Sequence, residues 1–341
     1  MLYIVISYLW ASILLYLLLG GADFGAGILE LFTSDKHRSN TRKTMYKAIG
    51  PIWEANHMWL IIAIVILFVG FPAIYTTASV YLHIPLVIML MGIIARGTAF
   101  SFRNYDAVVD EMQLIYSRIF VYASVITPLF LGIIAGSTVA GRIDPAAHDF
   151  VSAYVFSWLH WFSVAVGLFT VSICGFLAAV YLIGEADNET DRRRFITKTK
   201  TTNIAAFACG ALVFIAAKYE KIPLAEWIFG NAVGILAISA ASVSLILFWW
   251  LLVRKKTQVL RVLAAFQVTM ILIAITYRHY PNIILQKSAP PLSLMNAAND
   301  KTIAALGWAL LIGSIFILPA LFYLIYSFDR RNRKLAGTGH T

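Results

Sequence analysis

Ionisable side chains lie at the ends of long apolar segments, where a bilayer would make an unpaired charge costly. Asp23 follows Gly20 and Gly21 at the end of the first apolar segment, and Glu54 and His57 begin the second. A charged group at the centre of a membrane helix costs about 2.5–3.5 kcal/mol, so such residues pair with other groups or mark paths for protons and ions. Asp23 is therefore either a proton-conducting group or a structural carboxylate paired with an arginine or a backbone group.

The start of the second apolar segment combines an acid with an imidazole. Pro51 suits the first turn of a helix, which places Glu54 near the positive end of the helix dipole and His57 at i+3 on the same face. This pair predicts a proton entrance. The alternative is a glutamate that only stabilises the helix end, with Trp53 in the aromatic belt at the membrane surface.

Two arginines frame the end of the third apolar segment. Arg96 and Arg103 lie at the same predicted membrane level as Asp23 and Glu54. Arg96 is a suitable counter-ion for either carboxylate. An arginine at a helix end can equally extend toward lipid phosphate, so both interpretations stay open.

The composition requires a membrane. Of 341 residues, 60% are hydrophobic and 13% are charged, which leaves too little charge for a water-facing surface. The net charge of +10 does not indicate nucleic-acid binding, because the basic residues lie in short loops between apolar runs. Lipid is the expected surrounding partner. Cys174 and Cys209 lie in separate apolar runs and cannot supply a four-ligand metal cluster.

Nine segments are long enough to cross the bilayer as helices, since open sheets leave backbone groups unsatisfied in lipid. The fold class is all-α, with residues 1–341 forming a single membrane domain, in two four-helix bundles plus one extra helix. The first segment is interpreted as an uncleaved span, with a removed signal peptide as the alternative. The predicted spans are 2–22, 52–72, 76–95, 117–141, 156–183, 201–217, 228–253, 258–276 and 302–327.

The basic residues predict the orientation. Of the 27 lysines and arginines, 21 fall in one alternating set of loops and termini and six in the other. Loops rich in lysine and arginine are retained in the cytoplasm. We therefore expect the N-terminus outside and the C-terminus in the cytoplasm.

Histidines could in principle hold haem. His83 and His160 both lie toward the predicted outer side, where a bis-histidine site between them is conceivable. A membrane histidine more often hydrogen-bonds across helices, and no second pair at matched depth accompanies them. The sequence therefore predicts that this chain does not ligate haem. It also contains no nucleotide-binding or hydrolase motif, so catalysis by this chain alone is not expected.

Three segments together resemble subunit II of the cytochrome bd quinol oxidases. They are Gly20 to Glu30, Gly50 to Leu60 and Arg96 to Arg103. The resemblance implies a partner subunit I that binds haem b and haem d, oxidises quinol and reduces oxygen to water. It also allows a small single-helix accessory subunit. Subunit II itself is expected to ligate neither haem nor metal.

The family's tryptophan-acidic-x-asparagine motif matches Trp53, Glu54 and Asn56, with Glu where Asp also occurs. In the family this acid is implicated in admitting cytoplasmic protons. The resemblance implies proton entry at Glu54, and the polar clusters add Asp23 and His57 as expected members of the entry, with Trp53, Asn56, Arg96 and Arg103 as supporting partners. The expected location is a bacterial or archaeal cell membrane.

Two other classes of function remain open from the residues. Nine helices with buried carboxylates would also suit a secondary transporter or exporter. A purely structural assembly partner is the third class. Only the oxidase interpretation predicts that a haem-bearing subunit accompanies this chain.

Overall fold

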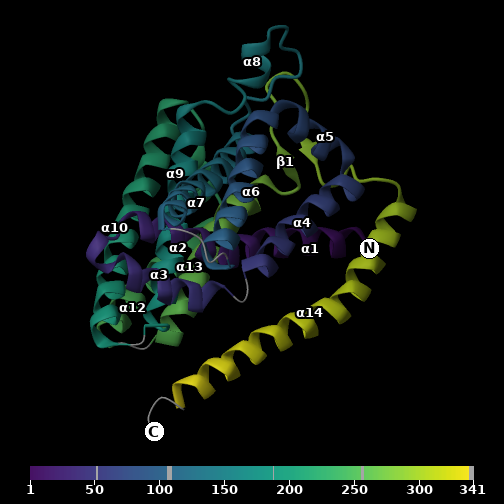
Figure 1. The fold of residues 1–341 in the computed structure, drawn as a ribbon. Helices are drawn as coiled ribbons and strands as arrows, with labels where there is room; N and C mark the ends of the chain where they lie inside the picture. Colours follow the sequence, from purple (N-terminus) through teal and green to yellow (C-terminus); the bar gives the residue numbers. More distant parts are fainter. Residues whose placement is uncertain (51–52, 106–109, 187, 255–256, 338–341) are drawn as a thin grey trace.

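The computed structural model is a helical membrane protein, which confirms the predicted all-α class (Figure 1). It describes residues 1–50, 53–105, 110–186, 188–254 and 257–337; Pro51, predicted to begin the second span, lies outside these ranges. Within them, nine helices are long and apolar enough to cross a membrane, as predicted. These are Leu2–Leu31, Trp53–Gly70, His83–Arg103, Met112–Val139, Trp161–Ile183, Glu189–Tyr219, Ala232–Leu252, Gln258–His279 and Asp300–Leu321.

The first span is longer than the predicted 2–22. Helix α1 (Leu2–Leu15) passes through a π-helical turn (Tyr16–Gly20) into α2 (Gly21–Leu31). The adjacent Gly20 and Gly21 loosen the helix without ending it, because glycine weakens a helix far less than proline does. The helix therefore carries Asp23 into the packed interior instead of leaving it in a loop.

The third span is displaced from the predicted 76–95. Pro72 begins a separate helix, α5 (Pro72–Tyr81), and the backbone leaves helical geometry at Leu82. Helix α6 (His83–Tyr105) then crosses the membrane. Proline suits the first turn of a helix, so Pro72 was the signal that a separate helix begins there. The continuous apolar run had hidden this boundary.

Among the remaining spans, the helices that begin at Asp110, Glu189, Thr257 and Asp300 are longer than predicted, and those that begin at Trp53, Trp161 and Ala232 are shorter. Helix α4 is the second span, and the short α8 precedes α9. Asn188 caps α10 by accepting the amide hydrogen of Asp191, which lets a charged segment continue the helix. The bounds are α4 Trp53–Gly70, α7 Asp110–Val139, α8 Phe150–Tyr154, α9 Trp161–Ile183, α10 Glu189–Tyr219, α12 Ala232–Val253, α13 Thr257–His279 and α14 Asp300–Gly337.

Shorter elements connect the spans at both ends. At the end that carries most lysines and arginines, here called the basic end, α3 (Asp35–Ile49) follows α2. At the opposite end lie α11 (Leu224–Phe229) and a small hairpin of β1 (Asn282–Ile284) and β2 (Leu292–Ser293). The hairpin was not predicted, because its strands are too short to show a periodic pattern.

Helix α9 lies at the centre of the packing. In the apolar 18-residue stretch of α9, 61% of the residues are buried, whereas in the corresponding stretch of α14 17% are buried. Helices α2, α7, α10 and α13 contact α9, while α6 packs on α7 and α12 packs on α13. Helix α9, the fifth span, thus also contacts spans of the first predicted four-helix group. Helix α14 contacts α1 and α4 and extends away from the other helices (Figure 1).

Candidate functional site

A buried ion pair joins α2 to α6. The Arg96 guanidinium donates to both carboxylate oxygens of Asp23, at 2.7 Å and 2.6 Å, and to the Asp23 backbone carbonyl at 3.0 Å. Its Nε donates to Ser124 Oγ on α7 at 3.0 Å. Both charged side chains are 1% exposed. Of the two carboxylates considered for Arg96, the structure selects Asp23.

Two glycines allow this pair to form. A Cβ at Gly25 would overlap the Cys174 carbonyl oxygen on α9, and a Cβ at Gly27 would overlap the Ser124 side chain on α7. Small residues let membrane helices approach until their backbones touch. Helix α2 therefore lies close to α7 and α9, and Asp23 comes within reach of the long Arg96 side chain.

Aromatic rings surround the Arg96 guanidinium. Phe24 and Phe120 lie with their ring centroids 5.0 Å and 4.9 Å from its central carbon. Ring faces attract a cation, most strongly where water is excluded. Each guanidinium nitrogen of Arg96 and each carboxylate oxygen of Asp23 also has a hydrogen-bond partner. Removing either residue would therefore leave a buried charge without compensation.

A second buried pair lies nearer the basic end and was missed from the sequence. Arg103 Nη1 lies 3.0 Å from Glu30 Oε2, and Arg42 Nη2 lies 2.7 Å from Glu30 Oε1. Glu30 follows Asp23 by seven residues, and Arg103 follows Arg96 by seven. Seven residues are about two helical turns, so equal spacing on α2 and α6 was the signal that could have revealed the second pair.

Glu54 lies at the surface, in the first turn of α4. Among the described residues it has no hydrogen-bond or ion-pair partner. Neighbouring Trp53 packs against Phe100 on α6 with ring centroids 5.1 Å apart, and Asn56 is buried. The predicted motif therefore points its acid outward and its tryptophan and asparagine inward.

His57 lies between Glu54 and the Asp23–Arg96 pair. Its ring centroid is 5.9 Å from that of Phe24 and 6.0 Å from that of Tyr16. Within the described part of the chain, His57 Nδ1 and the Tyr16 hydroxyl are buried without a hydrogen-bond partner. The structure thus packs His57 against Phe24, the residue that follows Asp23, and leaves Glu54 one turn away at the surface.

The two histidines weighed as haem ligands have other contacts. His83 Nδ1 lies 2.8 Å from the Val80 carbonyl oxygen, and its ring lies against Tyr154. His160 caps α9 by accepting the Ser163 amide hydrogen, and its Nδ1 lies 3.1 Å from Glu220. Burial lowers the pKa of His160, and the nearby Glu220 carboxylate opposes that shift. Each ring is therefore oriented by its own helix end.

Comparison with known proteins places these features in a family. Residues 1–328 match the family described as cytochrome bd terminal oxidase subunit II. The chain belongs to this family. The three segments that carried the resemblance, and all the predicted site residues, lie within the matched part.

Individual members of the cytochrome bd family are distant in sequence. The chain is 29% identical over 161 residues to cytochrome bd ubiquinol oxidase subunit 2 of Bacillus subtilis, covering 47% of this chain and 46% of that one. It is 25% identical over 226 residues to cytochrome bd-I ubiquinol oxidase subunit 2 of Escherichia coli K12, covering 64% and 58%. The chain thus spans about half the length of the curated relatives it matches.

The fold is similar over almost the whole chain to a solved member of the family. A chain of the bd oxidase from Geobacillus thermodenitrificans superposes with a TM-score of 0.77 and 21% identity, covering 96% of this chain and 98% of the other. At that identity the comparison establishes the fold alone. The buried ion pairs above are therefore properties read from this chain itself.

Proposed function

We propose that this chain is subunit II of a cytochrome bd-type complex that oxidises quinol and reduces oxygen to water. The family match over residues 1–328 carries the proposal. The chemistry belongs to haem b and haem d, which a partner subunit I would bind.

We further propose that protons enter this complex at Glu54. A surface carboxylate without a partner can exchange protons with water, and His57 one turn deeper offers a buried ring nitrogen that has no partner among the described residues. Asp23, fixed by Arg96, provides negative charge beside His57. The observation that carries this proposal is the succession from exposed Glu54 to half-buried His57, whose Nδ1 is buried.

The basic end is assigned to the cytoplasm of a bacterial or archaeal cell. The uneven distribution of lysine and arginine supports this assignment. Protons taken up from that side, with quinol protons released on the other, would separate charge across the membrane without a pump. Reporter fusions test the orientation: a reporter after Arg118 should be cytoplasmic and one near Leu294 external. The reverse pattern would contradict the assignment.

One preparation tests the oxidase assignment against the transporter and assembly classes. The tagged chain is purified from its native membrane, and a reduced-minus-oxidised spectrum is recorded. We expect b- and d-type haem bands from a co-purifying subunit, with quinol-dependent oxygen consumption. A preparation that contains this chain intact, with its stable partners and no haem, would contradict the oxidase assignment.

A further inference from the structure

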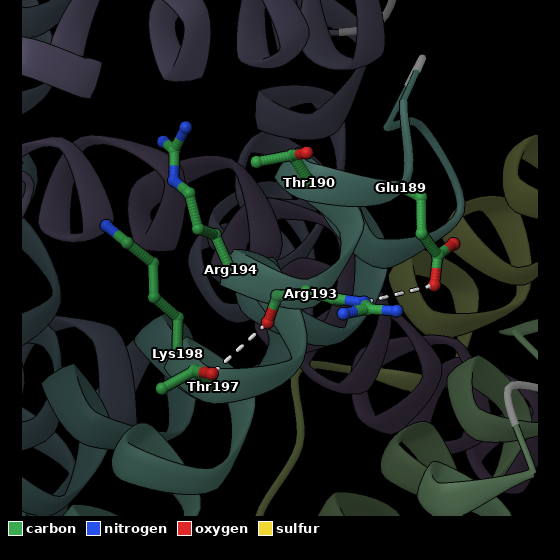
Figure 2. A pocket seen from close by; sticks show the side chains of 6 residues that line it. All are labelled: Glu189, Thr190, Arg193, Arg194, Thr197 and Lys198. Atoms are coloured by element: carbon green, nitrogen blue, oxygen red, sulfur yellow. Dashed lines mark hydrogen bonds and ion pairs between the residues drawn. The ribbon is translucent and has the colours of Figure 1, made fainter.

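An open cavity lies along the N-terminal turns of α10, at the basic end of the bundle. Its volume is about 710 Å³, and it is lined by Glu189, Thr190, Arg193, Arg194, Thr197 and Lys198. In Figure 2, Lys198 and Arg194 extend to one side of the helix and Arg193 turns toward Glu189 on the other. Because the helix belongs to a predicted span, the cavity lies where lipid headgroups would meet the protein.

The cavity carries more positive charge than its own acids compensate. Arg194 is bound by Asp191 at 2.5 Å, but the Arg193 side chain is 76% exposed and only loosely paired with Glu189 at 3.6 Å. Lys198 donates to the Leu29 carbonyl at 2.9 Å and to the Thr33 hydroxyl. No carboxylate in the described part of the chain pairs with Lys198. Arg193 and Lys198 can therefore accept an anionic ligand.

The surface of α10 becomes apolar directly beyond the cavity. Ile204 lies seven residues after Thr197, and Phe207 lies fourteen after Arg193; both spacings keep nearly the same helix face. Their side chains are 60% and 63% exposed. A free phosphate would need only the cations. A phospholipid would use both the cations and this exposed apolar face, one for its phosphate and the other for its acyl chains.

We propose that this cavity binds the headgroup of an anionic phospholipid, with an acyl chain lying along Ile204 and Phe207. Lys198 would hold the phosphate, and the exposed Arg193 side chain would reach it by turning away from Glu189. Lys198 also joins α10 to the end of α2 through Leu29 and Thr33, so bound lipid would fasten these two helices together. The inference does not depend on the oxidase assignment or on which side of the membrane the basic end faces.

Lipid titration followed by native mass spectrometry tests this site. The chain is purified from its native membrane with its accompanying proteins, delipidated in detergent, and titrated with phosphatidylglycerol or with zwitterionic phosphatidylcholine. Arg193→Gln and Lys198→Gln each remove one cation of the cavity. Lys200→Gln is the matched control, because Lys200 is exposed on the same turns of α10 but does not line the cavity.

We expect one phosphatidylglycerol site that phosphatidylcholine does not fill. Each cavity variant should weaken it about fivefold, while Lys200→Gln leaves it within about twofold. Equal weakening by Lys200→Gln, or no weakening by Arg193→Gln, would overturn the proposal. Because Arg193 is exposed, that variant stays informative even if Lys198→Gln misfolds. Displacement of the lipid by millimolar inorganic phosphate would also overturn it, since the cavity would then be a free-phosphate site.

Discussion

Arg96 binds Asp23 through both carboxylate oxygens, and a second buried pair of an acid and an arginine, Glu30 with Arg103, lies two helical turns away. Arg96 follows Asp23 by 73 residues, and Arg103 follows Glu30 by 73 as well. Helices α2 and α6 are thus joined by two buried ion pairs, each with its acid on α2. They are here called the inner rung (Asp23 with Arg96) and the outer rung (Glu30 with Arg103). In the inner rung Asp23 is followed by Phe24, whose ring packs against His57, and in the outer rung Glu30 also pairs with Arg42 of α3. The two rungs hold α2 against α6.

Breaking the inner rung should damage assembly. Arg96→Gln leaves Asp23 buried and uncompensated, which we expect to cost about 3–5 kcal/mol of stability. Asp23→Asn alone should cost a similar amount, and the double variant less than the sum, because it leaves no unpaired charge. Thermal unfolding of purified protein measures these losses. Arg118→Gln, an exposed arginine on α7, is the control and should change stability by less than about 0.5 kcal/mol. Additive losses in the double variant would show that the two groups act independently.

The contact between α2 and α9 should not tolerate a side chain at Gly25. Gly25→Ala places a methyl group on the Cys174 backbone carbonyl, which cannot move aside as a flexible side chain could. We expect little folded protein in the membrane, and faster proteolysis of what remains. Gly313→Ala is the matched control, because a Cβ there would lie 3.9 Å from Ile317, an ordinary van der Waals contact. Equal yields of the two variants would mean that α2 and α9 do not approach as closely as the contact between Gly25 and the Cys174 carbonyl requires.

Much of this architecture could be predicted from the sequence. Apolar runs long enough to cross a bilayer leave few alternatives to helices, so nine spans and the all-α class followed directly. The choice between Asp23 and Glu54 as the partner of Arg96 could not be predicted in this way. It depended on Gly25 and Gly27, whose small size draws α2 against α9 and α7. Such a contact is a tertiary property, and the apolar pattern of either helix does not encode it.

The second ion pair, the start of the third span and the rotation of α4 could not be predicted from the residue pattern along the chain. Glu30 lies beyond residue 22, where the first span was predicted to end and an acid would be ordinary, and only its spacing from Asp23 links it to Arg103. The third span was displaced because the apolar run hides the break at Leu82 between α5 and α6. The outward position of Glu54 and inward position of Asn56 depend on how α4 is rotated against its neighbours. Helix rotation is set by packing partners and not by a short motif.

The hairpin end of the molecule should loosen in acid. The Ser288 hydroxyl, the Ala146 amide and Lys287 together hold the pKa of Asp144 below its ordinary value of 3.8. The folded protein thus favours the ionised form, and this stabilisation is present above the ordinary value and lost as pH falls through the lowered one. Amides that tie the hairpin to α7 and its following loop, Leu285 and Lys287, should then exchange hydrogen faster. Mass spectrometry, corrected for intrinsic exchange, measures this.

Two variants separate this effect from general acid loosening. Asp144→Asn should raise exchange at Leu285 and Lys287 already at neutral pH and flatten its pH dependence. Asp149→Asn is the control, because Asp149 caps α8 by accepting the Ser152 amide hydrogen and does not contact the hairpin. Its effect should remain within α8. Unchanged hairpin exchange in Asp144→Asn would show that this carboxylate does not hold the loop.

Replacing Glu54 by Gln should slow quinol-dependent oxygen consumption while leaving assembly and haem content nearly intact. Glutamine keeps the volume and a hydrogen-bonding end but cannot ionise, so it separates proton transfer from packing. We expect a loss of about 10²-fold or more if protons depend on this carboxylate. Glu54→Asp should retain much of the activity, because a carboxylate remains one methylene shorter. Since Glu54 is exposed and has no partner among the described residues, neither substitution should disturb the fold.

His57 supplies the companion test of the same path. His57→Gln removes the titrating ring one turn deeper and should slow turnover similarly, whereas the double variant with Glu54→Gln should be little slower than either alone, because both block one route. If Glu54 only stabilised the start of α4, its loss would cost about 0.3–1 kcal/mol and leave turnover unchanged. Oxygen consumption per haem, measured with the haem spectrum on the same preparation, decides between them. Normal turnover per haem in Glu54→Gln would remove this residue from the proton path.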